Sequence, residues 1–307
     1  MKQAFIDSLT DIMRKKSEVI SVTADMGFSV YESMQKEFPT RFINTGVTEQ
    51  ASASFVAGLA LTGSKVFFYA QAAFITMRCF EQVRLDLGYN FLNVKLIGVN
   101  AGFSLNQLGV SHFAQEDVGL MRLIPRMTIF TPANAVEMRW AVNRAYAIDG
   151  PVYIRYSKVQ ASPSYSEGVT IRAGEPYQVS KGKDGVLIVS GGLLETAFEA
   201  VAELKKNGIN LSLYSMPTVK PINLKIILKL LRSAKVAFVL EEHSVIGGLG
   251  SSLAEIVAEN GIKTRVIRLG IQDIFTGVTG SIPYLLDRNG LSKNKIIAKI
   301  KLIFKKI

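Results

Sequence analysis

Short apolar runs alternate with helical patterns of apolar residues along the first half of the chain. Runs of this length are typical of buried strands, and the patterns between them repeat about every 3.6 residues, as in a helix. Strands that alternate with helices through short loops form a parallel sheet covered on both faces. The predicted strands are 19–22, 41–44, 66–69, 94–99, 127–130 and 152–155, and the predicted helices are 49–62, 74–87, 116–123 and 133–148.

The stretch 160–184 differs from its surroundings, because it is rich in Ser, Pro, Gly and charge and lacks helical periodicity. We predict domains at 1–160 and 185–307, joined by a linker at 161–184. The expected fold class is α/β, with two consecutive domains, each a mostly parallel sheet with helices on both faces. Beyond the linker the predicted strands are 186–190, 211–214, 236–241 and 265–269, with helices that include 195–206 and 252–259.

Composition agrees with two packed cores, since 48% of the 307 residues are hydrophobic and 20% are charged. No apolar stretch is long enough for a membrane helix, and the start of the chain lacks a signal-peptide core, so we expect a cytoplasmic protein. A single cysteine, Cys79, excludes an internal disulfide framework. Two histidines, His112 and His243, argue against a His-rich metal centre, and we expect this chain to hold no metal.

The formal net charge is +11, and much of the excess lies in the tail 293–307. Apolar residues recur there at helical spacing with lysines between them, which predicts a helix docked on the surface. Binding to a membrane surface or an acidic partner is the alternative. Charge alone does not indicate nucleic-acid binding, because no aromatic-basic module accompanies it. We therefore expect neither a nucleic-acid nor a membrane partner.

The most informative segment is 41–63, RFINTGVTEQASASFVAGLALTG. A predicted strand ends at Asn44, the chain turns, and a helix begins with Glu49 in its first turn. Helix amides stabilise a carboxylate at that position, so a capping role would account for Glu49. The helix is also rich in Ala, Ser and Gly, which would let another backbone or a flat ligand approach closely.

This segment resembles the pyrimidine-binding domain of transketolases and deoxyxylulose-phosphate synthases, in the order Gly-Val-Thr-Glu-Gln, a small-residue helix, then Ala-Gly-Leu-Ala. In that family the glutamate contacts N1′ of the aminopyrimidine of thiamine diphosphate. The resemblance implies that Glu49 holds a proton there, which favours the tautomer whose 4′ nitrogen removes the C2 proton of the thiazolium. It also implies that the neighbouring Gln50 contacts the cofactor.

Two further segments carry the resemblance. FITMRCFEQVR at 74–84 is similar to the family segment whose aromatic residue packs on the pyrimidine, which implies cofactor contacts for Phe74 and Arg78. The pattern alone also fits a plain amphipathic helix with Phe74, Met77, Phe80, Val83 and Leu87 on its core face.

The loop within 99–125 resembles the family's Gly-x-Thr-His loop, which implies a catalytic or substrate-orienting role for His112, with Ser111 beside it. A lone loop histidine can also be solvated or structural.

The second half of the chain resembles the C-terminal domain of the family through VLIVSGG at 186–192 and EEHSVIGGLG at 241–250. The glycine run 247–250 opens a helix and could hold an anion. Glu241 and Glu242 just before it would repel phosphate, so we expect tight packing there. In the family this domain supports the dimer, which implies self-association into the dimer core of an α2β2 heterotetramer.

Several substrate positions depart from the family pattern. Asn100 stands where transketolases carry a histidine, and Leu108 stands where they carry an acid. Lys2 and Lys158 occupy places of the arginines that bind the sugar phosphate, with Arg155 close by, and Ser29 is a further predicted substrate contact. Lysine lacks the bidentate geometry of arginine. We therefore expect a small sugar substrate, possessing a modified or deoxy carbon rather than an ordinary pentose phosphate.

The sequence has no Gly-Asp-Gly, the motif with which the family holds the cofactor diphosphate through Mg²⁺. The resemblance therefore implies a partner, an N-terminal diphosphate-binding subunit that holds Mg²⁺, and the start at Met1 favours a split enzyme. The expected function is ketol transfer from a ketose to an aldose. The alternatives are a deoxyxylulose-phosphate synthase, the β subunit of a 2-oxoacid dehydrogenase, and a non-catalytic regulatory or assembly subunit.

Overall fold

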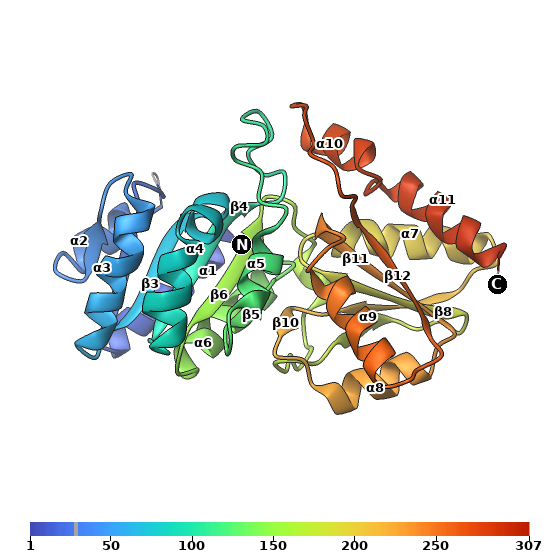
Figure 1. Cartoon of the computed structure of the whole chain (residues 1–307), viewed down its shortest axis with the longest axis horizontal. Coiled ribbons are helices and arrows are strands. Elements are labelled where there is room, and N and C mark those ends of the chain that lie inside the picture. Colours follow the sequence, from blue (N-terminus) through green and yellow to red (C-terminus); the bar gives the residue numbers. More distant parts are fainter. Residues whose placement is uncertain (28–29, 307) are drawn as a thin grey trace.

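The computed structural model describes residues 1–27 and 30–306, which form two consecutive α/β units (Figure 1). The first unit is built on a seven-stranded sheet of order β10-β5-β6-β4-β3-β1-β2, in which only β10 is antiparallel to its neighbour. The second has a five-stranded sheet of order β12-β11-β8-β9-β7, in which only β7 is antiparallel. The predicted fold class is confirmed. The strands of the first sheet are β1 (Val19–Thr23), β2 (Phe42–Asn44), β3 (Lys65–Gln71), β4 (Val94–Ala101), β5 (Thr128–Phe130), β6 (Val152–Ser157) and β10 (Thr218–Lys220).

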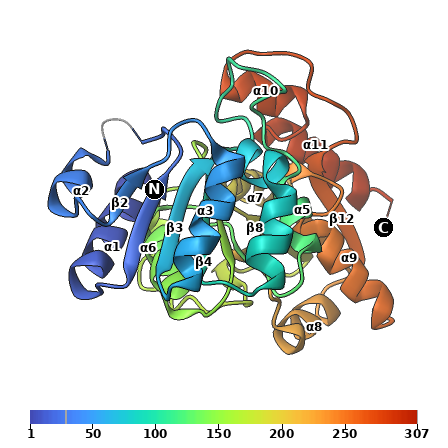
Figure 2. The same cartoon turned by 60° about the vertical axis from the view of Figure 1, so that its left-hand side comes forward.

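Helices cover both faces of the first sheet, because successive side chains of each strand point to opposite sides. Phe67 packs with α1 and α6 in one core, and its neighbour Phe68 packs with α3, η2 and α5 in another. Figure 2 shows α3 and α5 lying on the near face of the sheet. The helical elements are α1 (Lys2–Lys15), α2 (Glu32–Glu37), α3 (Glu49–Leu61), η1 (Phe74–Arg78), α4 (Phe80–Gln82), η2 (Val83–Tyr89), α5 (Asp117–Leu123) and α6 (Ala135–Ala147).

The segment 74–89 departs from an ordinary α-helix. Both η1 and η2 are π-helical, and the short α4 lies between them. In a π-helix each backbone hydrogen bond spans five residues instead of four, so side chains at α-helical spacing no longer lie on one face. The predicted core face is therefore partly wrong: Met77 is 37% exposed, and the buried apolar positions are Ile75, Cys79, Val83 and Leu87.

The second unit repeats the layered arrangement. On one face of its sheet α8 and α9 pack in the same core as α3 and α5, and on the other face α7 packs with α11. The strands are β7 (Tyr177–Ser180), β8 (Gly185–Ser190), β9 (Leu211–Ser215), β11 (Val236–Ser244) and β12 (Arg265–Ile271). The helices are η3 (Pro163–Tyr165), α7 (Leu194–Lys206), α8 (Leu224–Arg232), α9 (Leu249–Glu259), α10 (Ile282–Arg288) and α11 (Lys293–Phe304).

The predicted tail helix is confirmed as α11, docked on the surface. Ile296, Ile300 and Ile303 are buried, and Lys293 Nζ lies 3.5 Å from Glu199 Oε2 on α7. The lysines between the isoleucines lie on the solvent side of α11, as the spacing of its apolar residues predicted. None of the helices in the described ranges is long and apolar enough to span a bilayer.

The two units are joined by more than the connecting segment. Strand β10 comes from the second half of the chain, yet it pairs with β5 of the first sheet. Strand β7 lies inside the stretch 161–184 expected to be a linker, and it pairs with β9. One apolar core continues across the boundary and includes Val66 of β3 together with Val239 of β11. Short edge strands such as β7 and β10 are too brief to show in a hydrophobic pattern.

Candidate active site

Glu49 begins α3, directly after β2 and a turn in which Gly46 has a positive φ of 71°. Its carboxylate is 3% exposed, and Oε2 accepts a hydrogen bond from Arg78 Nη1 at 2.8 Å. Within the described part of the chain only Oε2 carries such a bond, and Oε1 has no hydrogen-bond partner there. A cavity of about 520 Å³ borders this carboxylate, and Gln50 and Arg78 line it as well.

A row of contacts leads from Glu49 through Arg78 and Phe74 to His112. The guanidinium carbon of Arg78 lies 4.1 Å from the centroid of the Phe74 ring, a cation–π contact within one turn of η1. On the same aromatic ring, His112 packs edge-on, with the centroids 5.1 Å apart. The structure thus brings together Glu49, Gln50, Phe74, Arg78 and His112, which the sequence analysis singled out separately.

The loop that carries His112 follows β4 and is closed by a pair of backbone hydrogen bonds between Gly102 and Ala114. Ser111 Oγ lies 2.9 Å from His112 Nδ1 and can set the tautomer of the ring. The tip of the loop is held by the second unit, because Asn106 Nδ2 donates to Gly280 O at 2.6 Å. His112 is therefore positioned by contacts from both units.

Cys79, adjacent to Arg78, is the one thiol of the chain. It is fully buried, and burial together with the nearby Glu49 charge raises its pKa to about 12. A thiol with such a pKa stays protonated at neutral pH, so it offers no nucleophile.

A second cavity, of about 510 Å³, gathers the predicted substrate residues Lys2, Asn100 and Lys158. It lies at the carboxyl ends of β1, β3, β4 and β6, the edge where parallel α/β sheets bind ligands. Asn100 Nδ2 donates to Gln71 Oε1 at 3.0 Å, and the Asn100 backbone has a φ of 56°. A non-glycine residue in this left-handed region is a recurrent feature of functional sites.

Asp25 and Gln160 line the same cavity, and the sequence analysis did not identify them. The sequence does contain a signal for Asp25, because this acid follows β1 and therefore lies at the carboxyl edge of the sheet. Its backbone is also left-handed, with a φ of 49°, and its amide donates to Asn44 Oδ1 at 3.0 Å. The predicted contact Ser29 lies outside the described residues.

Two predicted substrate residues do not line that cavity. Leu108 lies on the His112 loop and is 53% exposed. Arg155 is 6% exposed and its Nε donates to Asp117 Oδ2 at 2.8 Å, while Nη2 donates to the carbonyl oxygens of Ala114 and Glu242. The prediction for Arg155 is wrong, because this side chain is turned to the boundary between the units instead of the sheet edge.

Around Arg155, buried polar groups from the two units meet. Glu242 Oε1 accepts from Phe103 N at 2.8 Å and Oε2 accepts from Ser157 Oγ at 2.8 Å. Burial raises the pKa of the Glu242 carboxyl. A Cβ on Gly102 would lie 2.3 Å from that carboxyl group, so only glycine fits there.

The glycine run 247–250 opens α9, as expected, but a ligand is not needed to cap it. Glu241 accepts hydrogen bonds from the amides of Leu249 and Gly250, both at 2.8 Å. A Cβ on Gly248 would lie 2.3 Å from the same carboxylate. The expectation of tight packing is confirmed, with Glu241 supplying the anion at this helix N-terminus.

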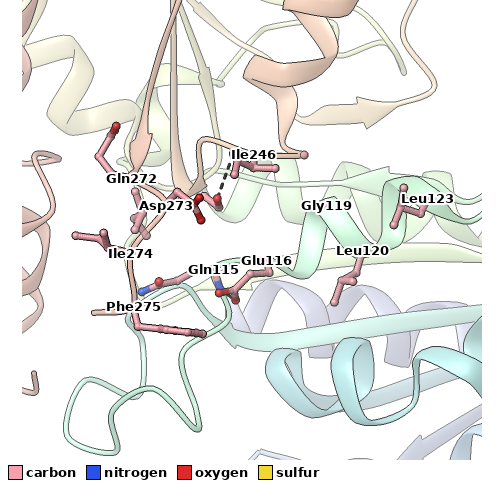
Figure 3. A pocket seen from close by; sticks show the side chains of 13 residues that line it. Gln115, Glu116, Gly119, Leu120, Leu123, Ile246, Gln272, Asp273, Ile274 and Phe275 are labelled. Atoms are coloured by element: carbon pink, nitrogen blue, oxygen red, sulfur yellow. Dashed lines mark hydrogen bonds between the residues drawn. The ribbon is translucent and has the colours of Figure 1, made fainter. Parts of the chain in front are cut away.

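An apolar cleft of about 510 Å³ lies between the units (Figure 3). The segment 115–123 borders one side, and residues 272–275 border the other. Large apolar side chains are exposed around it: Leu123 is 72%, Ile246 56%, Ile274 67% and Phe275 81% accessible. Contiguous apolar surface of this kind marks an interaction site.

Among the described residues no group of three or more His, Cys, Asp or Glu side chains is placed to hold a metal ion. The cavities that border Glu49 and Lys2 are lined by the carboxylate, guanidinium, amide and ammonium groups described above.

The comparisons with known proteins cover almost the whole chain. Residues 1–163 match the family model of the transketolase pyrimidine-binding domain, and residues 174–296 match that of the transketolase C-terminal domain. A transketolase C-terminal section of Methanocaldococcus jannaschii is 34% identical, over 98% of this chain and 95% of that protein. A 6-deoxy-6-sulfo-D-fructose transketolase subunit of Clostridium sp. is 32% identical, over 97% and 92%.

A solved structure, a split gene transketolase in an inactive β4 tetramer, is similar with a TM-score of 0.86 and 32% identity, covering 97% of this chain and 95% of that one. Deoxyxylulose-phosphate synthases also match, and the chain spans about half of their length, for example 48% of the one from Chlorobium phaeovibrioides. Because two family models in succession and relatives of nearly equal length agree, this chain belongs to the transketolase family and comprises its pyrimidine-binding and C-terminal domains.

Proposed function

We propose that this chain is the pyrimidine-binding subunit of a two-chain transketolase, which transfers a two-carbon ketol unit from a ketose donor to an aldose acceptor. The observation that carries the proposal is the row of contacts from Glu49 through Arg78 and Phe74 to His112. Glu49 and Arg78 border one cavity, and the loop of His112 is held by the second unit.

The residues of that row fit the aminopyrimidine of thiamine diphosphate, the cofactor on which the family depends. Glu49 Oε1 is a buried acceptor for a ring N–H, and Phe74 is an aromatic surface beside it. The cofactor supplies a thiazolium that takes up the electron pair when the ketose carbon–carbon bond breaks. Glu49 would hold the proton at N1′, while the hydrogen bond from Arg78 orients its carboxylate.

His112 would hold or move a proton at a hydroxyl or carbonyl of the sugar, since one imidazole nitrogen can donate a hydrogen bond and the other can accept one. Lys2 and Lys158 would attract an anionic group at the far end of the substrate, and Asp25 and Asn100 would hydrogen-bond its hydroxyls. This assignment gives the cofactor to the cavity at Glu49 and the substrate to the cavity at the carboxyl edge of the first sheet.

We further propose a partner subunit that holds the cofactor diphosphate and Mg²⁺. The support is the lack of a Gly-Asp-Gly in this sequence and the relatives of nearly equal length that are themselves subunits or split proteins. Self-association into an α2β2 assembly is proposed because a relative is solved as a β4 tetramer. The exposed Ile274 and Phe275 make the apolar cleft of Figure 3 the surface proposed to be covered by the second copy.

Partner dependence is the first test. The isolated chain is expected to show no turnover and to bind thiamine diphosphate weakly, because Glu49 and Phe74 contact only the pyrimidine end. Titration calorimetry with and without Mg²⁺ measures the binding, and a coupled ketol-transfer assay with the partner chain added measures the turnover. Tight, Mg²⁺-dependent binding by this chain alone would contradict the two-chain proposal.

The same assay separates the alternatives. Activity with pyruvate as the donor would indicate a deoxyxylulose-phosphate synthase. A partner that turns over equally well without this chain would indicate a regulatory subunit.

Substrate preference is the second test. We expect a modified or deoxy aldose to be a better acceptor than ribose 5-phosphate, by about tenfold in kcat/KM. The neutral Asn100 amide already donates to Gln71 Oε1, whereas a protonated histidine would make stronger, charge-assisted hydrogen bonds to the sugar hydroxyls. Asn100→His should shift the ratio of kcat/KM values toward ribose 5-phosphate. Leu108→Asp, on the exposed loop outside the cavity, should shift it less. Ribose 5-phosphate as the best acceptor of the unmodified enzyme would show that the altered-substrate proposal is wrong.

A further inference from the structure

A third cavity, of about 530 Å³, lies in the second unit, far along the chain from the residues assigned to catalysis. It is bordered by the end of β12, the turn between α10 and α11, and one face of α11. Its charged lining is entirely cationic: Arg268, Arg288, Lys295 and Lys299.

The packing of α11 explains why these charges gather. Its isoleucines face α7, which leaves Lys295, Ala298, Lys299 and Leu302 on the side of the cavity. Lys295 and Lys299 are four residues apart and therefore neighbours on the helix surface, where like charges repel. An anion bound between them would remove that repulsion.

Acidic side chains of the described residues do not neutralise the group. The ion pairs of the structure include none with Arg288, Lys295 or Lys299. Asp287, next to Arg288, accepts from Ser292 Oγ at 2.6 Å, and Asp273 borders the apolar cleft instead. Arg268 differs from the other three cations, because its Nη1 donates to Val245 O at 2.7 Å.

The rest of the lining is largely apolar. Leu269 is buried at the base, and Leu302 and Ile274 leave apolar surface on the walls. A cavity of this size suits a small organic ligand, and its polar groups set the orientation of that ligand. A lining that combines cations with apolar side chains calls for a ligand that combines phosphate with a flat, weakly polar group.

We propose that this cavity binds a nucleoside phosphate, with the phosphates between Arg288, Lys295 and Lys299 and the base against Leu269 and Leu302. Both parts of the lining are needed for this class of ligand. Inorganic pyrophosphate would use only the cations, and a neutral nucleoside would use only the apolar walls.

Titration calorimetry of the isolated chain with ADP, pyrophosphate and adenosine tests the proposal without reference to ketol transfer. ADP should bind more tightly than either of the other two. The variant Lys295→Glu/Lys299→Glu should weaken ADP binding at least tenfold while keeping the fold, because Glu suits the first turn of a helix as well as its interior. The matched control is Lys305→Glu/Lys306→Glu, which makes the same change in net charge beyond the end of α11 and should leave ADP affinity unchanged.

Four outcomes would overturn the proposal. No heat with ADP at millimolar concentration would show a merely solvated basic face. Equal weakening in both charge-reversal variants would show attraction by net charge alone. Pyrophosphate binding as tightly as ADP would show that the apolar walls contribute nothing. Phosphatidylserine vesicles that bind the chain and displace ADP would show a membrane surface instead of a nucleotide site.

Discussion

Replacing Glu49 by Gln is expected to keep the fold and to lower the kcat of the reconstituted enzyme by about 10²–10⁴-fold, the usual contribution of a proton-transfer group. Glutamine has the same shape and can still accept from Arg78, so α3 and η1 should stay in place. It cannot hold the proton at N1′ in the same way, because its amide oxygen is far less basic than a carboxylate. The rate of hydrogen–deuterium exchange at C2 of the bound cofactor, followed by NMR, reports this step directly.

The control for Glu49→Gln is Glu81→Gln, an exposed acid in the same region of the fold. It makes the same chemical change away from the cavity and should leave both exchange and kcat unaltered. If hydrogen–deuterium exchange at C2 is unchanged in the Glu49→Gln variant, the role of Glu49 is only to anchor Arg78 and the start of α3.

Replacing Arg155 by Met is expected to lower the free energy of unfolding by about 3–5 kcal/mol, the cost of leaving one member of a buried ion pair unpaired. Asp117 is completely buried, and its Oδ1 has no hydrogen-bond partner within the described residues even in the native protein. Among the described residues, Tyr153 alone would still hydrogen-bond the Asp117 side chain, since its hydroxyl donates to Oδ2 at 2.7 Å. Urea denaturation followed by circular dichroism measures the change.

Two companion variants sharpen that measurement. Arg14→Met breaks the exposed pair with Glu37 and should change the stability little, since solvent screens both groups. The double variant Asp117→Asn/Arg155→Met removes both charges and should recover part of the loss. An Arg155→Met protein as stable as the native one would show that the buried pair makes no net contribution.

The central strands of both sheets could be predicted from the sequence because they are rich in apolar residues, as in 236–240, whereas the short edge strands β7 and β10 could not. The face of the segment 74–87 could not, since a π-helix changes the spacing on which periodicity depends. Helix α1 was not predicted, although it buries Phe5, Leu9 and Met13 at helical spacing. Polar and charged residues separate these apolar positions in the sequence.

For the candidate site, ordered motifs identified residues that come together in space, such as Glu49, Phe74 and His112. Closeness to a motif was not enough to place Arg155, because a residue near the end of a strand can face either the substrate or another layer of the protein. Only the packing of β6 against α5 and β11 shows which side it takes. Lys2, Asn100 and Lys158 border one cavity although they are far apart in sequence, and no local pattern contains that information.

The pairing of β10 with β5 bears on how genes for such enzymes can be divided. A break between residues 161 and 184 would place the edge strand of the first sheet on a different polypeptide from the sheet itself. It would also separate Arg155 from Glu242 and Asn106 from Gly280. Each fragment would then expose an unpaired strand edge and apolar surface, both of which promote aggregation. The pyrimidine-binding and C-terminal domains of this chain are thus expected to be inherited and exchanged as one module.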